Sequence, residues 1–183
     1  MLTIFVTDIF GRTPELETCF SGFNLPYQIV DPYGGEYHSF DDETAAYHYF
    51  MQHVGIEKYS ELLFEAIAQC HVPVSVVGFS AGASALWHVA ARSKAPHLAS
   101  GIGFYGSQIR HALELTPQIP LKLVFPIKES HFDVNDVMQS LANHNHVEVC
   151  QSQYLHGFMN PLSVNYHAQG CVDTLSKLEL LLK

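Results

Sequence analysis

The fold of this chain is constrained most by one short stretch, Gly78-Phe79-Ser80-Ala81-Gly82. It follows an apolar, β-branched run (residues 72–77) that predicts a buried strand, and it precedes residues 83–91, which predict a helix. A G-x-S-x-G sequence between a strand and a helix forms a turn so tight that a Cβ at either glycine collides with its neighbours. The turn lifts the Ser80 hydroxyl clear of the sheet. We therefore expect Ser80 to be a nucleophile; a plain glycine-rich connection is the alternative.

A nucleophilic serine needs a base, and His156 is the best-placed candidate. It follows the strand expected at residues 147–151 and precedes Gly157, which puts it on a loop above the carboxyl edge of the sheet. Ligands bind at that edge in open α/β folds. The chain has 12 histidines, so most of them have other roles. We expect packing roles within helices for His48 and His167. Surface positions are expected for His38, His53, His71, His97, His111, His144 and His146.

The third member of a catalytic triad is an acid that orients the base. It is expected between Ser80 and His156, on the loop that follows the strand at residues 121–125. This loop offers Glu129 and Asp133. Glu129 is the first choice because it comes sooner after the strand. Asp133 is the alternative, although it is equally suited to cap the helix expected at residues 134–141.

Four segments stand together in the order and spacing of a known family. They are Asp8-Ile9-Phe10-Gly11, Gly78-Phe79-Ser80-Ala81-Gly82, Tyr105-Gly106 and His156-Gly157-Phe158. By these segments nearly the whole chain resembles the dienelactone hydrolases, which have the α/β-hydrolase fold. The tight turn at Ser80, called a nucleophile elbow, itself makes the backbone N–H of Ala81 one donor of an oxyanion hole.

The resemblance implies roles for two further residues. The backbone N–H of Ile9 is the second oxyanion donor. Asp8 occupies the family's acidic position, where it can lie close to the nucleophile. A turn residue that caps the helix starting near residues 13–14 is the alternative role for Asp8.

The chain departs from that family at several places. Family members that open dienelactones use a cysteine nucleophile, where this chain has Ser80. The family often has Asp before a His-Phe pair in the acid loop, where this chain has Ser130. The family has further strands before its first motif, so we expect a trimmed sheet. The arginines that hold a substrate carboxylate have no convincing counterparts. Arg12 directly follows the segment that carries Ile9, a position from which it could meet an anionic group of the substrate. A solvated charge at a helix start is its more ordinary role.

Strands and helices alternate along the rest of the chain, which predicts an α/β fold with helices on both faces of a mostly parallel sheet. Residues 1–183 are expected to form a single α/β-hydrolase domain. About six strands are expected, at residues 2–6, 27–30, 72–77, 100–105, 121–125 and 147–151. Helices are expected at residues 14–20, 41–54, 56–69, 83–91, 134–141 and 172–182.

Composition excludes several function classes. The chain has 18 acidic and nine basic residues, a net charge of −9, so nucleic acid and anionic membrane surfaces are poor partners. No apolar run is long enough to span a bilayer, and no export signal is evident. The four cysteines lack C-x-x-C spacing and are most simply free, buried thiols of a reducing cytoplasm. No metal-binding spacing is present among the histidines, so no metal and no cofactor is expected.

These observations predict a serine hydrolase that cleaves a small ester, lactone or thioester through an acyl-serine intermediate. Its partner is a small-molecule acyl substrate; the oligomeric state stays open. A hydrolase-fold protein that binds without catalysis is the alternative, because fold alone does not guarantee chemistry. A transferase or peptidase with the same triad is a second alternative.

Overall fold

Six strands form one sheet in which every neighbouring pair runs parallel, in the order β2-β1-β3-β4-β5-β6. The computed structural model describes residues 1–92 and 95–183. Its strands are β1 (Leu2–Val6), β2 (Tyr27–Val30), β3 (Val74–Phe79), β4 (Leu98–Phe104), β5 (Leu121–Phe125) and β6 (Val147–Gln151). Its helices are α1 (Pro14–Phe20), α2 (Glu43–His53), α3 (Gly55–Ala68), α4 (Ala81–Ala90), the 3-10 helix η1 (Ser107–His111), α5 (Val134–Leu141) and α6 (Ala168–Leu181). The α/β fold and the parallel sheet are confirmed.

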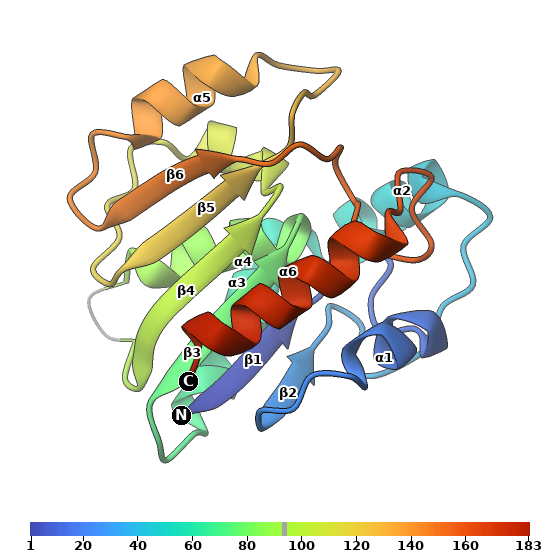
Figure 1. The fold of residues 1–183 in the computed structure, drawn as a ribbon, viewed down its shortest axis with the longest axis horizontal. Coiled ribbons are helices and arrows are strands. Elements are labelled where there is room, and N and C mark those ends of the chain that lie inside the picture. The colour runs from blue at the N-terminus through green and yellow to red at the C-terminus, as the bar shows by residue number, and fades with distance from the viewer. Residues whose placement is uncertain (93–94) are drawn as a thin grey trace.

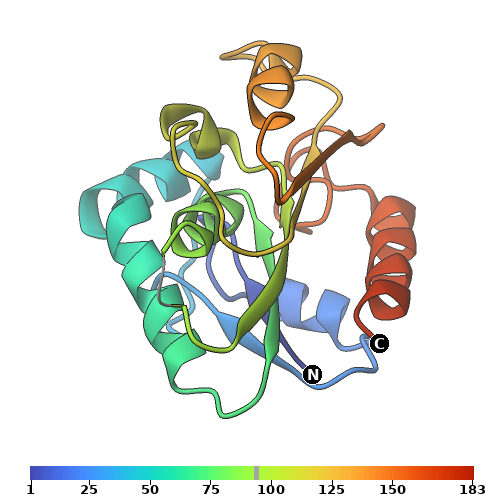
Figure 2. The same ribbon diagram turned by 90° about the vertical axis from the view of Figure 1, so that its left-hand side faces the viewer.

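Helices cover both faces of this sheet. Figure 2 shows α1 and α6 on one side of the strands and α3 and α4 on the other, and Figure 1 shows α6 crossing in front of β1 and β3. Successive residues of β1 point to opposite faces: Ile4 and Val6 pack with α3 and α4, whereas Phe5 packs with α1. The Phe5 and Phe20 rings stack with centroids 4.4 Å apart. Each such buried side chain contributes about 1.5–3 kcal/mol to folding.

Several element boundaries differ from the sequence expectations. Strand β3 begins at Val74, two residues late, because it pairs with β1 from Leu2 onward. Helix α6 begins at Ala168, four residues early, because the His167 ring acts as its cap: Nδ1 accepts a hydrogen bond from Gly170 N at 2.9 Å. Histidine is not among the usual capping residues, so the sequence did not indicate this start.

Two other expectations concern burial. Cys70 and Cys171 are buried, whereas Cys19 and Cys150 are half-buried, so the expectation of buried thiols holds for two of the four. His48, assigned to helix packing, is exposed on α2. Within the described part of the chain, no helix is long and apolar enough to cross a membrane.

The start of α4 packs very closely against the end of β1 at Gly82. A Cβ built on Gly82 lies 2.3 Å from the Val6 carbonyl oxygen and 2.5 Å from the Thr7 carbonyl oxygen. Both are backbone atoms, so neither can turn aside as a side chain can. Glycine at this position therefore lets α4 begin directly beside the loop that follows β1.

We predict that Gly82→Ala lowers the free energy of unfolding by roughly 1–3 kcal/mol, because the methyl group forces the helix and the strand apart. Urea unfolding of the purified protein measures this loss. Gly22→Ala is the matched control, since a Cβ there meets nothing within 4 Å, and it should change stability by less than about 0.5 kcal/mol. Equal effects of the two substitutions would contradict the account.

Candidate active site

Ser80 occupies the turn between β3 and α4 in a backbone conformation that side chains rarely adopt, with φ 49° and ψ −109°. Such a conformation costs about 1–3 kcal/mol and persists only where its surroundings fix it. Here Ser80 N donates to the Phe104 carbonyl at 2.9 Å, and the Ser80 carbonyl accepts from Ser84 N at 3.0 Å. The sharp turn is thus held by the neighbouring strand on one side and by the first turn of α4 on the other.

The structure brings together three of the residues proposed from the sequence. Ser80 Oγ lies 2.9 Å from His156 Nε2, and His156 Nδ1 lies 2.7 Å from Glu129 Oε1. With the ring proton on Nδ1, the imidazole donates to Glu129 and accepts from the serine hydroxyl, so both contacts are satisfied. The Glu129 side chain is only 11% exposed, which shields its contact with the imidazole from water.

These three residues come from the carboxyl ends of three strands. Ser80 directly follows β3, Glu129 lies after β5 and His156 lies after β6. A parallel sheet places these ends along one edge, so residues far apart in the sequence meet there.

Asp133, the alternative acid, lies elsewhere in the same loop. Its carboxylate accepts a hydrogen bond from Asn135 N at 2.8 Å and caps α5, and its side chain is exposed. The acid in contact with His156 is Glu129.

Ile9 and Ala81, whose backbone N–H groups are proposed for the oxyanion hole, border the same cavity as Ser80. Among the described residues, no acceptor is found for Ile9 N–H. Ala81 is the first residue of α4, where an N–H has no partner within the helix. The close packing of Gly82 on the end of β1 keeps these two segments adjacent.

Asp8 is buried at the start of the oxyanion loop, and its carboxylate ties this loop to another. Phe10 N donates to Asp8 Oδ1 at 3.0 Å, and Asn160 Nδ2 donates to Asp8 Oδ2 at 2.6 Å. Because Asn160 lies four residues after His156, the pair joins the oxyanion loop to the histidine loop. The alternative role for Asp8, as a helix cap, is wrong: the cap of α1 is Thr13, whose hydroxyl accepts from Leu16 N.

The histidine loop has further supports that sequence reasoning missed. Asn165 Nδ2 donates to the His156 carbonyl at 3.0 Å. The Tyr105 ring lies beside the His156 ring, with centroids 5.0 Å apart. Asn160 and Asn165 stand in a segment rich in Gly, Asn, Pro and Ser, a composition that indicates a loop but not which loop residues face the histidine.

The cavity above Ser80 has a volume of about 670 Å³. From α2 and the start of α3 its lining takes the apolar and aromatic side chains Tyr47, Phe50, Met51 and Ile56, together with Glu43 and Thr44. Gln108, Arg110 and Phe132 also line it, with the Arg110 guanidinium 4.9 Å from the centre of the Phe132 ring. The cavity therefore offers both apolar and polar side chains.

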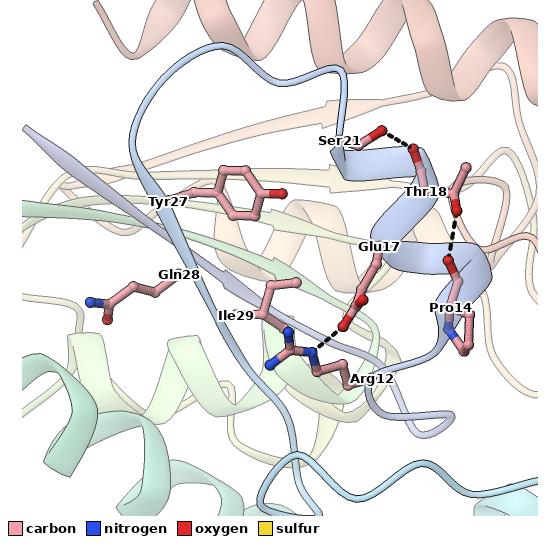
Figure 3. A pocket seen from close by; sticks show the side chains of 8 residues that line it. All are labelled: Arg12, Pro14, Glu17, Thr18, Ser21, Tyr27, Gln28 and Ile29. Carbon is pink, nitrogen blue, oxygen red and sulfur yellow. Dashed lines mark hydrogen bonds and ion pairs between the residues drawn. The ribbon is translucent and has the colours of Figure 1, made fainter.

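Arg12 lies outside this cavity. It borders a separate hollow of about 830 Å³ between α1 and β2. Figure 3 shows the Arg12 and Glu17 side chains pointing toward one another, and the two form an ion pair. Glu17 also accepts a hydrogen bond from the Tyr37 hydroxyl at 2.9 Å. Arg12 is thus bound to its own neighbour on α1, in keeping with a charge at a helix start. In residues 1–92 and 95–183, no group of three or more His, Cys, Asp or Glu residues is arranged to hold a metal ion.

Comparison with known proteins gives one relative by sequence and several by structure. The chain is 33% identical over 144 residues to the uncharacterised protein YczH of Bacillus subtilis, a match that spans 77% of this chain and 70% of YczH. No family model matches the sequence.

The solved structures that resemble the chain share its fold at low sequence identity. A proposed dienelactone hydrolase from Klebsiella pneumoniae has a TM-score of 0.69 at 18% identity, with 97% of this chain and 84% of that one covered. The dienelactone hydrolase-like promiscuous phosphotriesterase P91, from metagenomic libraries, has a TM-score of 0.66 at 14% identity, with 98% and 84% covered. Est1E of Butyrivibrio proteoclasticus has a TM-score of 0.61 at 9% identity, with 98% and 87% covered. At these identities the likeness confirms the α/β-hydrolase fold.

The buried carboxyl of Asp8 should make stability depend on pH. Burial raises the pKa of Asp8 from 3.8 to about 6, against the opposing hydrogen bonds from Asn160 and Phe10. A raised pKa means that the neutral carboxyl stabilises the fold below about pH 4, and that this contribution is lost as the pH rises through 6. The side chain of Asp8→Asn stays neutral at every pH. We therefore predict that its free energy of unfolding rises relative to that of wild type by about 2–3 kcal/mol as the pH increases from about 4 to about 7.

Urea unfolding of both proteins at about pH 4 and pH 7 measures this difference. Asp133→Asn is the matched control, because Asn caps a helix about as well as Asp and the side chain is exposed. A stability difference between Asp8→Asn and wild type that does not change with pH would contradict the predicted linkage.

Proposed function

Because the chain belongs to the same family as YczH of Bacillus subtilis and has the α/β-hydrolase fold of dienelactone hydrolase-like proteins, we propose that it is a serine hydrolase. Its substrate is a small ester, lactone or thioester. The observation that carries the proposal is the continuous contact from Ser80 Oγ through His156 to Glu129 at the wall of one cavity.

In the first half of the proposed reaction, Ser80 Oγ attacks the substrate carbonyl while His156 Nε2 takes the hydroxyl proton. Glu129 holds the proton on Nδ1 and stabilises the imidazolium that forms. The carbonyl oxygen becomes negatively charged, and the N–H groups of Ile9 and Ala81 donate to it. His156 then returns the proton to the leaving group, and an acyl-serine remains.

In the second half, His156 takes a proton from a water molecule, and the resulting hydroxide attacks the acyl-serine carbonyl. The same two N–H groups stabilise the second oxyanion. Collapse of this intermediate releases the acid, and the proton on His156 returns to Ser80. Water as acceptor makes the protein a hydrolase; product analysis with added alcohols or amines tests for transfer to other nucleophiles.

The size of the cavity supports the proposal of a small-molecule substrate. Its volume of about 670 Å³ lies within the range of small-ligand pockets. The apolar and aromatic side chains of α2 suit a short acyl chain or an aromatic leaving group. A panel of chromogenic esters of increasing acyl length defines which of these the cavity accepts.

We predict that Ser80→Ala and His156→Ala each lower ester turnover on the order of 10³-fold or more, and that the double variant is little worse. The reason is that both side chains act in one proton-transfer step. Turnover of a chromogenic ester measures the loss, and a fluorophosphonate probe should label wild type but not Ser80→Ala. A folded wild-type protein that the probe leaves unlabelled would favour the alternative of a binding protein.

We predict that Glu129→Gln lowers kcat on the order of 10²–10⁴-fold, because the amide cannot hold the imidazole in the reactive tautomer as a carboxylate does. Circular dichroism and thermal unfolding should show a folded protein. Asp133→Asn changes a carboxylate of the same loop and should leave kcat within about twofold, since the cap is retained. If the Asp133 change removed activity and the Glu129 change did not, the assignment of the acid would be overturned.

A further inference from the structure

The backbone on the amino side of the proposed oxyanion donor is fixed by hydrogen bonds. The Asp8 carbonyl, which belongs to the same peptide unit as Ile9 N–H, accepts from Gly11 N at 3.1 Å and from Thr7 Oγ1 at 3.2 Å. A peptide unit is planar, so holding its oxygen also sets the direction of its N–H.

The peptide unit on the other side of Ile9 is fixed at both of its polar atoms. Phe10 N donates to Asp8 Oδ1 at 3.0 Å. The Ile9 carbonyl accepts a hydrogen bond from the Tyr33 hydroxyl at 2.6 Å. In the described part of the chain, Ile9 N–H is then the one polar group of these two peptide units that has no partner.

Tyr33 itself is firmly held. It lies in the loop after β2, where Tyr33 N donates to Asp31 Oδ1 at 2.8 Å. Its ring packs directly on the oxyanion loop, because a Cβ built on Gly11 lies 2.6 Å from Tyr33 Cδ2. The rings of His38 and Tyr49 pack around it, with centroids 4.6 and 5.5 Å away. Burial raises the pKa of Tyr33, so the hydroxyl stays protonated and remains a donor at neutral pH.

We propose that Tyr33 is a positioning residue of the oxyanion hole, which helps to fix the direction of Ile9 N–H by holding the adjacent peptide unit through its hydrogen bond to the Ile9 carbonyl and by its ring contact with Gly11. The inference rests on the proposed function, in which Ile9 N–H stabilises the oxyanion. Tyr33 does not border the cavity above Ser80. It acts through the loop, so its loss should weaken binding of the transition state more than binding of the substrate.

The variant Tyr33→Phe tests this directly, because it removes the hydroxyl and keeps the ring that packs on Gly11. A small misplacement of a catalytic group lowers rates by up to about 10²-fold, so we expect kcat to fall roughly 10- to 100-fold with KM within about threefold. A boronic acid that forms a tetrahedral adduct with Ser80 should lose affinity by a similar factor.

Tyr49→Phe is the matched control. It removes a hydroxyl from a ring in the same aromatic cluster, and that hydroxyl makes no hydrogen bond to residues 1–92 or 95–183. It should leave kcat and boronic acid affinity unchanged. Wild-type values of both quantities in folded Tyr33→Phe would overturn the proposal.

Amide hydrogen exchange separates failure of this inference from failure of the proposed function. Tyr33→Phe should speed exchange at Phe10 and Gly11 by about tenfold, whereas Tyr49→Phe should not, because only the first variant frees the loop. If the activity did not depend on Ser80, the proposed function would fail, and with it the catalytic role of Tyr33. If the activity depended on Ser80 but Tyr33→Phe left turnover and exchange at wild-type values, only the present inference would fail.

Discussion

The site depends on how closely the start of α4 packs on the end of β1. Gly82 brings the helix so near the strand that a single methyl group would overlap two backbone carbonyl oxygens. This packing has two consequences for the site. It lets α4 begin directly after the sharp turn at Ser80, and it places the first residue of α4 beside the loop that carries Ile9. Backbone contacts therefore fix Ser80 and the start of α4, whereas the segment that carries Ile9 is held by side chains as well.

The parallel sheet supplies the rest of the site, and hydrogen bonds between loops fix it. His156 reaches Ser80, and Glu129 reaches His156, because β3, β5 and β6 end at the same edge. Loops at such an edge are not held by the strands alone. Asn160 joins the histidine loop to Asp8, and Tyr33 joins the loop after β2 to Ile9. The side chains that make these contacts, Asp8, Asn160 and Tyr33, do not border the cavity, so they act by holding the loops in position.

Sequence patterns were sufficient for the features that depend on local backbone. The G-x-S-x-G stretch predicted the sharp turn at Ser80. Hydrophobic patterning predicted about six strands, and their alternation with helices predicted a mostly parallel sheet. The choice between Glu129 and Asp133 depended on the path of one loop, which local sequence leaves open. The pair Asp8 and Asn160, separated by 152 positions, was not predicted, because nothing in either segment indicates which partner the other will meet. The early start of α6 was missed because a histidine ring caps it.

The central claim is that Ser80, Ile9 N–H and Ala81 N–H act on one carbonyl group. A crystal structure of the protein after reaction with a fluorophosphonate tests it most directly, because the phosphonyl group mimics the tetrahedral intermediate. The account predicts a covalent bond from Ser80 Oγ to phosphorus and a phosphonyl oxygen within about 3 Å of both Ile9 N and Ala81 N. A label on another residue, or a phosphonyl oxygen directed away from both N–H groups, would contradict it.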